Sequence, residues 1–387
     1  MKFFHLSDLH IGKTVNRFSM LEEQENVFDQ IIAYIRKEKP DAVIIAGDVY
    51  DRAIPGVEAV RIFDDFLTNL AREDIAVMLI AGNHDSPERM DYASRLLSEK
   101  KLFLCGSFNG KIQKHMLADK YGEVNFWLLP FIKPIAVRNY FADLSIESYD
   151  DAVRVILSEA NIDYSQRNIL VSHQFYTKSG ITALRSDSEM DMVGGMDAVD
   201  AGLIENFDYA ALGHLHGKQP VGAKHIQYAG SPVKYSLSEW RHEKSINSVI
   251  LNEKGDLNIE SLSLKPIHDM REIKGNMEAL LSDEVASLRD KNDYLKVILT
   301  DEEEIIDPMG KLRSVYPNIM HLDLEKPRKN NSSAEINHDL EAARELSPLE
   351  LFDNFFNMQL NKQLSAEQKK IAREILETED SDLGLLN

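Results

Sequence analysis

The chain has 387 residues, of which 43% are hydrophobic and 28% are charged. This composition excludes a disordered chain, and the length favours two or three domains over a single core. One cysteine, Cys105, excludes an internal disulfide and a metal cluster built on several thiolates. The net charge of -20 argues against a simple basic surface for nucleic acid, unless divalent cations or a basic partner subunit offset it.

Neither a membrane span nor a secretory signal is expected. No segment approaches the run of about 18 apolar residues that a membrane-spanning helix needs. The first residues, MKFFHLSDLHIG, become polar too soon for a signal peptide. A single cysteine is typical of a reducing compartment, so we expect a cytoplasmic protein.

Up to about residue 263, short apolar runs alternate with amphipathic segments. Continuous apolar runs, typical of buried strands, occupy 2–7, 41–47, 75–82, 126–131, 168–173 and 207–213. Helical spacing is found at 22–38, 55–73 and 150–162. We expect residues 225–239 and 245–264 to add antiparallel strands, with a turn at 253–256. This alternation predicts a layered α/β core.

The pattern changes near residue 265. Four short segments between 271 and 326 predict a small α+β domain, and a polar stretch follows it. Two short helices then begin at Ser347 and Ser365, each with the spacing of a capping box. The predicted parts are a main domain at 1–265, a capping domain at 266–327, a linker at 328–345 and a helical partner-binding motif at 346–387.

Polar side chains follow five of the predicted strands at their carboxyl ends. They are Asp8, His10, Asp48, Asn83, His84, His173, His214 and His216. Ligands of open α/β sheets bind outside the carboxyl ends of the strands, so we expect these side chains to converge. Gly47, Gly82 and Gly213 precede several of them and permit sharp turns or close backbone approach.

The types of these side chains indicate a metal centre. Carboxylate, amide and imidazole ligands without thiolate suit Mn²⁺, with iron or zinc as alternatives. Seven ligand candidates exceed one ordinary site, whereas two metals ~3.5–4 Å apart would use them and clamp an in-line displacement at phosphorus. Asp48 is the natural bridge. Each motif taken alone is also explained by a turn, a helix cap or an ordinary histidine in a loop. The prediction of a metal centre therefore depends on all of them lying at the carboxyl ends of the strands.

These motifs resemble a known superfamily. DLH at 8–10, GDVYD at 47–51, GNHD at 82–85, SH at 172–173 and GHLH at 213–216 look like those of calcineurin-like metallophosphoesterases. Within that superfamily, DLHIG, GNHDSPER, LVSHQF and YAGSPVKYSLSE resemble the SbcD family, the nuclease subunits of bacterial SbcCD complexes. The resemblance covers about residues 1–265. It implies a four-layer α/β/β/α sandwich, followed by a small α+β capping domain and C-terminal helices.

The resemblance also implies roles for the clustered residues. The first metal would be held by Asp8, His10, Asp48 and His216. The second would be held by Asp48, Asn83, His173 and His214. His84 would act beside the metals as a catalytic group, and Mn²⁺ is the usual ion.

The implied activity is two-metal hydrolysis of DNA phosphodiester bonds. It comprises a 3′→5′ exonuclease on double strands and an endonuclease on single strands and hairpins, acting in DNA repair, recombination and replication. The implied partner is SbcC, an ABC-type ATPase with a coiled coil, joined to an SbcD homodimer in a heterotetramer. Four cationic residues flank the metal loops and are predicted to contact DNA phosphates: Lys13, Arg17, Arg52 and Arg89.

Other hypotheses remain open. GDVYDR, with Arg52, echoes phosphoprotein phosphatases, and GNHD with GHLH also suits small cyclic-nucleotide or dinucleotide phosphodiesterases. A non-catalytic DNA-end scaffold is a third alternative, which the complete set of candidate ligands disfavours. The segment LELFDNFFNMQL has one broad apolar face that packs either on its own domain or on a partner.

Overall fold

The computed structural model of the chain describes residues 1–178, 186, 187, 189, 197–303, 305–325, 348–360 and 363–372. The chain forms two compact units, residues 1–325 and 326–387. The predicted linker at 328–345 and the capping position Ser347 lie outside the described residues.

The first of two six-stranded sheets has the order β16-β15-β1-β4-β5-β6. Its strands are β16 (Leu257–Ser263), β15 (Ser245–Leu251), β1 (Lys2–Leu6), β4 (Ala42–Ala46), β5 (Ala76–Ile80) and β6 (Leu102–Cys105). The four strands from β1 to β6 run parallel, with His5 of β1 beside Ile44 of β4. The β15–β16 hairpin adds antiparallel strands beside β1.

The second sheet has the order β13-β14-β12-β9-β8-β7. Its strands are β13 (Gln219–Val221), β14 (Ala223–Tyr228), β12 (Tyr209–Leu212), β9 (Arg167–Ser172), β8 (Gly122–Leu129) and β7 (Gln113–Asp119). Its four central strands are parallel, and β7 and β13 are antiparallel edges. Two short two-stranded sheets complete the sandwich. One pairs β2 (Thr14–Val15) with β3 (Phe18–Ser19), and the other pairs β10 (Phe175–Thr177) with β11 (Ala198–Asp200).

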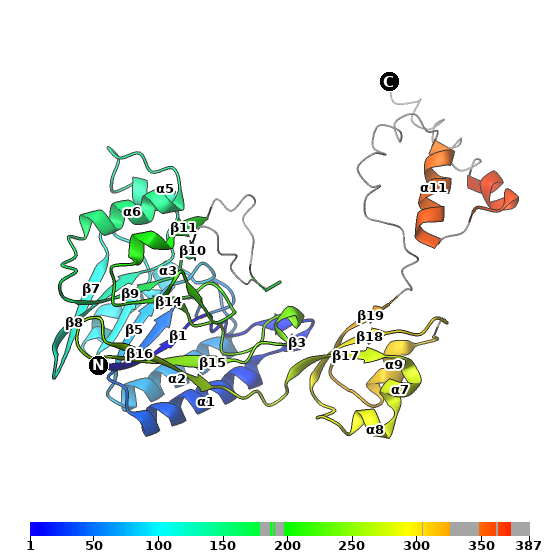
Figure 1. Cartoon of the computed structure of the whole chain (residues 1–387), viewed down its shortest axis with the longest axis horizontal. Helices are drawn as coiled ribbons and strands as arrows, with labels where there is room; N and C mark the ends of the chain where they lie inside the picture. The colour runs from blue at the N-terminus through cyan, green and yellow to red at the C-terminus, as the bar shows by residue number, and fades with distance from the viewer. Residues whose placement is uncertain are drawn as a thin grey trace. The chain divides into compact units, whose positions relative to one another are not determined.

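Helices cover the outer face of each sheet (Figure 1). On the first sheet lie α1 (Leu21–Glu38) and α2 (Val57–Arg72), and on the second lie α5 (Pro134–Arg138) and α6 (Tyr149–Glu159). Shorter helices are α3 (Pro87–Met90), α4 (Ser94–Ser98), and the 3-10 turns Ala201–Ile204 and Leu237–Glu239. The result is the predicted four-layer α/β/β/α sandwich.

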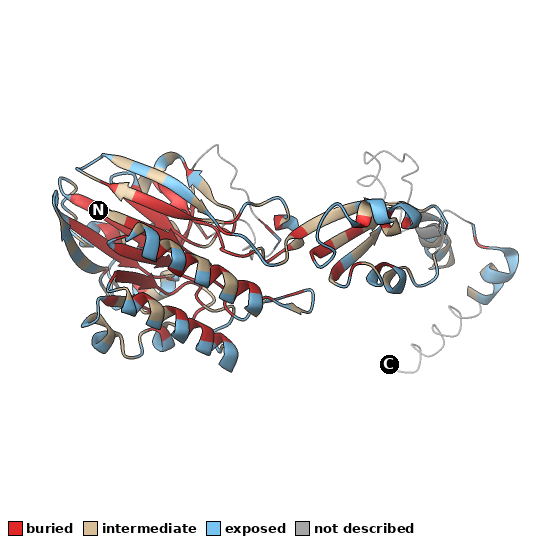
Figure 2. Cartoon of the chain, turned by 90° about the horizontal axis from the view of Figure 1, so that it is seen from below, coloured by how far each residue is buried: buried red, intermediate tan, exposed pale blue. Residues whose placement is uncertain are grey.

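The strands read as continuous apolar runs because both of their faces are buried, as Figure 2 shows. Side chains of neighbouring residues in a strand point to opposite faces. Phe4 therefore packs with the helices α1 and α2, whereas Phe3 packs between the two sheets against Phe126 and Tyr209. A third apolar core joins the second sheet to α6.

A smaller parallel sheet follows within the same unit. It consists of β17 (Met270–Gly275), β18 (Tyr294–Leu299) and β19 (Ile319–Leu324), with α7 (Met277–Leu281), α8 (Asp283–Ala286) and α9 (Pro308–Arg313). These elements enclose an apolar core of their own. A small α+β domain was predicted here; its helices and strands are present, and its sheet is parallel. Its boundaries at 266 and 327 stay predictions.

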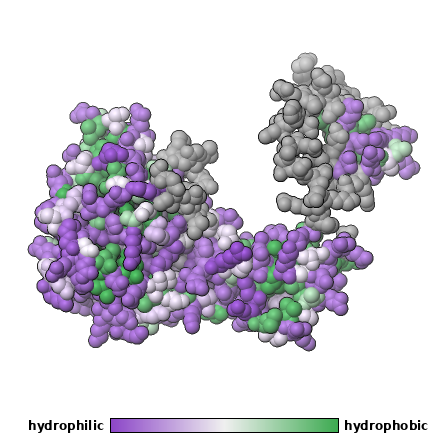
Figure 3. All heavy atoms as spheres, viewed as in Figure 1, coloured by the Kyte–Doolittle hydropathy of each residue, from purple (hydrophilic) through white to green (hydrophobic). Residues whose placement is uncertain are grey.

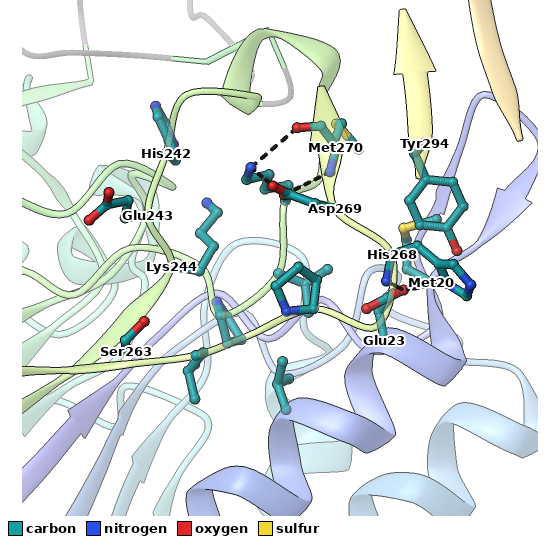
Figure 4. A pocket seen from close by; sticks show the side chains of 16 residues that line it. Met20, Glu23, His242, Glu243, Lys244, Ser263, His268, Asp269, Met270 and Tyr294 are labelled. Carbon is teal, nitrogen blue, oxygen red and sulfur yellow. Dashed lines mark hydrogen bonds and ion pairs between the residues drawn. The ribbon is translucent and has the colours of Figure 1, made fainter. Parts of the chain in front are cut away.

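The junction between the small sheet and the sandwich contains a pocket of about 330 Å³, shown in Figure 4. The buried carboxylate of Glu23 on α1 accepts hydrogen bonds from the backbone N–H groups of Ile267 and His268, at 2.8 and 2.9 Å. Lys234 donates to Asp269 at 2.7 Å from the opposite wall. Polar contacts with residues 267–269, which lead directly into β17, thus hold this strand against the sandwich.

Three details of the predicted strands were wrong or missing. The strand predicted at 225–239 ends at Tyr228; it is antiparallel to β13, as expected, but parallel to β12 on its other side. Pro232 cannot donate to a ladder, and the chain turns there. The strands β6 and β7 were not predicted, because β6 has only four residues and β7 is a half-exposed edge. The turn at 253–256 between β15 and β16 is confirmed.

The second unit contains α11 (Pro348–Leu360) and a helical segment at 366–372. The predicted capping box is confirmed there: Ser365 Oγ accepts from the Gln368 backbone at 3.2 Å, and Gln368 accepts in return at 2.9 Å. Within the described parts of the chain, none of the helices has the length and apolar character to cross a membrane.

Replacing Glu23 by Ala would leave two backbone donors without their acceptor. We expect the free energy of unfolding to fall by about 1–3 kcal/mol, the usual cost of unpaired buried polar groups. Urea titration followed by circular dichroism measures this loss. Glu25→Ala, on an exposed position of the same helix, is the control and should change little. Equal stability of the two variants would contradict the proposed role of Glu23.

Candidate metal centre

Two loops of the first sheet are joined by backbone hydrogen bonds. The loop after β1 carries Asp8 and His10, and the loop after β4 carries Asp48. The N–H of Asp8 donates to Gly47 O and the N–H of His10 donates to Asp48 O, both at 3.0 Å. The three side chains therefore extend from two loops whose backbones are hydrogen-bonded to each other.

Four of the predicted ligands adopt left-handed backbone conformations, which residues other than glycine rarely do. Their φ angles are 53° at Asp8, 42° at His10, 51° at Asp48 and 105° at His214. Each such residue costs of order 1–3 kcal/mol and persists only when its surroundings enforce it. Strain concentrated on candidate ligands indicates a functional site.

The loop after β5 supplies Asn83, His84 and Asp85. The buried Asp85 carboxylate accepts from the backbone of Val49, Tyr50 and Gly82 at 2.9–3.1 Å, which ties this loop to the loop after β4. Burial raises the pKa of Asp85 to about 6, and the Asp48 carboxylate adds to the effect. Asp85 thus orients the loops, as its position next to the ligands suggests.

The second sheet contributes His173 after β9, and His214 and His216 after β12. The backbone N–H of His214 donates to Asp8 Oδ1 at 2.9 Å, so the two sheets meet at this point. Gly213 lies against Ala46 O of the first sheet so closely that a Cβ would clash there. The glycine predicted for close backbone approach has that role.

The structure brings all seven predicted ligands together. His10 Nε2 lies 3.1 Å from His216 Nε2, and His173 Nε2 lies 3.2 Å from Asp48 Oδ2. Asn83 Oδ1 lies 3.2 Å from His173 Nε2 and 3.1 Å from His214 Nδ1. Three overlapping groups of potential ligand atoms result: Asp8, His10 and His216; His10, Asp48 and His84; and Asp8, Asp48 and His173.

The position of the proton on the His173 ring leaves its other nitrogen free to bind a cation. His173 Nδ1 lies 2.6 Å from Ala46 O, which only accepts, so Nδ1 carries the proton. The lone pair of neutral His173 at Nε2 then faces the oxygens of Asp48 and Asn83, an arrangement that needs a positive charge between them. Oxygen and imidazole ligands fit a divalent transition metal.

In the absence of a metal, a proton on His173 Nε2 supplies the positive charge beside Asp48. Burial alone would lower the pKa of His173, but the Asp48 carboxylate outweighs it and raises that pKa to about 9. Burial would raise the pKa of Asp48, yet His173 holds it well below its usual range. Burial raises the pKa of Asp8, the second carboxylate of the cluster. A buried centre of this kind favours cations that bring more charge than a proton.

His84 stands at the more open side of the cluster. Its backbone N–H donates to Asp48 Oδ1 at 2.8 Å, and its ring Nδ1 donates to Asp51 O at 2.9 Å. Because Nδ1 holds a proton for the carbonyl, Nε2 is the atom left for exchange with a bound molecule. The ring lies 4.7 Å from that of His10.

The four predicted DNA contacts lie in different surroundings. Lys13 is bound to Asp51 at 2.8 Å, so its charge is partly neutralised. Arg52 follows the Asp48 loop with 81% of its side chain exposed. Arg17, between β2 and β3, and Arg89, in α3, are also exposed. Exposure permits phosphate contact, and the assignments stay predictions.

Two supporting residues were not predicted from the sequence. Glu239 is fully buried and lies 3.2 Å from His216 Nδ1, which fixes the ring with Nε2 facing the cluster. Lys244 donates to the other Glu239 oxygen at 2.6 Å and to His216 O at 3.1 Å. Glu239 ends the YAGSPVKYSLSE segment, but nothing in the spacing of that segment places its carboxylate beside His216, so the fold was needed to reveal this carboxylate–histidine pair.

Family models match two parts of the chain. Residues 1–218 match the calcineurin-like phosphoesterase model, and residues 266–359 match a model described as the type 5 capsule protein repressor C-terminal domain. The first match contains every predicted metal ligand.

Curated relatives match nearly the whole chain. The chain is 32% identical over 384 residues to the SbcD subunit of the SbcCD nuclease of Staphylococcus epidermidis, covering 97% of this chain and 98% of that protein. It is 31% identical over 381 residues to the SbcD subunit of Staphylococcus saprophyticus, with coverage of 97% and 98%.

A solved structure of a dimetal phosphatase from Danio rerio is also similar. It is 11% identical, and the match covers 69% of this chain and 99% of that chain, with a TM-score of 0.40. A score this low carries no argument about the site.

Replacing Glu239 by Gln would remove the charge that orients His216 and balances Lys244. We expect the affinity for Mn²⁺ to fall about 10–100-fold, the usual effect of losing such a supporting contact. Isothermal titration of the metal-free protein with Mn²⁺ measures it. Glu243→Gln, an exposed neighbour, is the matched control. Wild-type affinity in a folded Glu239→Gln variant would refute the role.

Proposed function

Because the chain belongs to the SbcD nuclease family of calcineurin-like phosphoesterases, we propose that it cleaves DNA phosphodiester bonds at this centre, with Mn²⁺ as the activating ion. One observation carries the proposal: five loops from two sheets bring oxygen and nitrogen ligands within contact of one another around two buried carboxylates. We infer that the parallel strands of both sheets end at the same edge and that the loops following them supply the metal ligands.

The proposed ligand sets divide the cluster at Asp48. One metal is held by Asp8, His10, Asp48 and His216, and the other by Asp48, Asn83, His173 and His214. The 3.1 Å contact between His10 and His216 supports the first set, and the contacts of Asn83 with both histidines support the second. Bound divalent cations supply charge neutralisation at the phosphate and lower the pKa of a water molecule.

The chain's own groups position the reaction and move its proton. Asp51 O accepts a hydrogen bond from His84 Nδ1, which leaves Nε2 facing the substrate side; when the ring is doubly protonated, Nε2 donates its proton to the leaving 3′-oxygen and the ring becomes neutral. The backbone contact of His84 with Asp48 fixes the distance between this histidine and the metal ligands. The hydrogen bonds between the loops after β1 and β4 keep these groups in place before the substrate binds.

We propose the substrate forms that the family name and the sequence motifs suggest. They are double-stranded DNA ends, cut as a 3′→5′ exonuclease, and single strands and hairpins, cut as an endonuclease, in DNA repair, recombination and replication. A small phosphodiesterase remains the second candidate for the chemistry, but it would not need residues 266–387. The phosphatase hypothesis is weaker, because Ala53 stands where that family has glycine and GNHD stands where it has GNHE.

The proposed partner is an SbcC-type ATPase with a coiled coil, which makes cleavage ATP-dependent. The name of the curated relatives, which places them in an SbcCD complex, supports it. The predicted apolar face of α11 contains Leu349, Phe352, Phe355 and Phe356, and the side chain of Phe355 lies outside the described residues. Phe352 and the adjacent Leu351 are each 42% exposed, which supports a surface that a partner helix covers.

We also propose a homodimer within that complex. Figure 3 shows apolar patches on an otherwise hydrophilic surface. A groove of about 620 Å³ lies between α2 and α3, lined by apolar residues such as Phe63 and Met90. Ile54, Val57 and Tyr92 near it are each at least 74% exposed, which supports a surface that a second copy covers.

The enzymatic proposal predicts that the purified protein cleaves circular single-stranded DNA when Mn²⁺ is present. A chelator should abolish cleavage, and added Mn²⁺ should restore it. His84→Gln should bind Mn²⁺ and DNA normally and lose cleavage by about 100-fold or more, since general acids contribute on this scale. Gel assays and titration calorimetry measure these outcomes.

His321→Gln, an exposed histidine of the small sheet, is the control for His84. Undiminished cleavage by His84→Gln would remove this residue from the mechanism. Failure of the wild type to cut a circle, together with hydrolysis of cyclic nucleotides, would favour the small phosphodiesterase.

The partner proposal predicts that Leu351→Ser with Phe352→Ser in the full chain abolishes co-purification with SbcC. The variant should keep Mn²⁺-dependent cleavage of single strands, because the metal centre lies in residues 1–325. Asn357→Ser on an exposed position of α11 is the control. Retained binding by the double variant would contradict the assignment.

A further inference from the structure

A small aromatic pocket adjoins the metal centre. Its volume is about 220 Å³, and it is lined by Asn83, His214, Phe131, Lys133, Tyr149, Phe175 and Asp197. Asn83 and His214 are proposed ligands of one metal, so a phosphate bound there would place its nucleoside at the pocket. The volume is below the ~300 Å³ at which sites for drug-sized ligands begin, so it suits one ring system.

The walls of this pocket are aromatic and firmly placed. Phe131 and Tyr149 have ring centroids 6.2 Å apart, and Phe175 packs 5.9 Å from the ring of His214. Phe175 and Tyr149 are buried, with 7% and 8% exposure. Planar bases stack on such rings, with a gain of about 1–3 kcal/mol per base.

One polar group in the pocket lacks a partner. Asp197 is 8% exposed, and among the residues that the structure describes its Oδ1 has no hydrogen-bond partner. Tyr149 and Asp197 line the same pocket; burial raises the pKa of Tyr149, and the Asp197 carboxylate raises it further. A buried carboxylate oxygen without a donor is costly, so a ligand that brings an N–H group would be favoured.

We propose that this pocket binds the nucleobase next to the scissile phosphate, with Asp197 accepting a hydrogen bond from its exocyclic amino group. Adenine, cytosine and guanine carry such a group, whereas thymine has none: its one donor, N3–H, lies between two carbonyl oxygens that the carboxylate repels. The exposed Lys133 at the pocket lies where it can contact the adjacent phosphate. The inference rests on the proposed nuclease function and adds a base preference to it.

The test compares cleavage of single-stranded poly-dA and poly-dC with that of poly-dT by the Mn²⁺-loaded full chain. Each rate is divided by the rate on methyl p-nitrophenyl phosphate, a diester without a base, so a general loss at the metal centre cancels. The wild type should prefer poly-dA and poly-dC by about tenfold, the discrimination that one hydrogen bond to a charged group supplies. Asp197→Asn should reduce this preference to about twofold or less.

A second variant keeps the test informative if Asp197→Asn is unstable. Phe131→Leu should weaken binding of dAMP and dTMP alike by about fivefold or more, because it removes stacking while staying apolar. Ile135→Ala, an exposed position that does not line the pocket, should leave both unchanged.

The outcomes separate this inference from the nuclease proposal. An unchanged base preference in Asp197→Asn, or equal affinity of the wild type for dAMP and dTMP, would overturn the pocket while leaving the nuclease intact. Absence of DNA cleavage with preserved hydrolysis of the base-free diester would instead overturn the nuclease. In that case the calorimetric comparison of dAMP with dTMP still decides whether the pocket binds a base.

Discussion

The hydrogen bond from the His214 backbone to the Asp8 carboxylate holds together everything else at the site. It joins the ends of the two sheets, and it uses a carboxylate that is also a proposed metal ligand. The same pole contains the contacts of His173 with Ala46 and Asp48, which cross between the sheets as well. The apolar core between the sheets fixes their positions relative to each other. The polar contacts then hold the proposed ligands of one sheet beside those of the other.

The layered fold was predictable because four strands in each sheet run parallel and the inner ones are buried on both faces. That arrangement produces continuous apolar runs whose ends fall at one edge, so the positions of Asp8, Asp48 and His173 follow from strand order alone. The edge strand β7 escaped prediction because its half-exposed face breaks the pattern. Glu239 and Asp197 escaped it for another reason: they reach the centre from irregular segments, whose paths depend on packing and not on periodicity.

The backbone strain at the site explains why its support is so extensive. Asp8, His10 and Asp48 all have positive φ, yet none is a glycine, because each must also present a ligand. Gln24 donates to His10 O at 2.8 Å and to Tyr235 OH at 2.9 Å, and so braces the first of these loops from α1. Side chains far apart in the sequence thus share the cost of holding conformations that a free loop would abandon.

The charge of the chain sets how it can approach a polyanion. With a net charge of -20, long-range attraction cannot draw DNA to the surface, and Lys13 is already paired with Asp51. In our proposals, DNA binding would then come from short-range interactions: cations held by the buried carboxylates, exposed arginines such as Arg52, and stacking in the pocket beside His214. In the proposed function, a partner bound at the apolar face of α11 would add the affinity for DNA that the negative charge of this chain withholds, while the metal loops provide the cleavage itself.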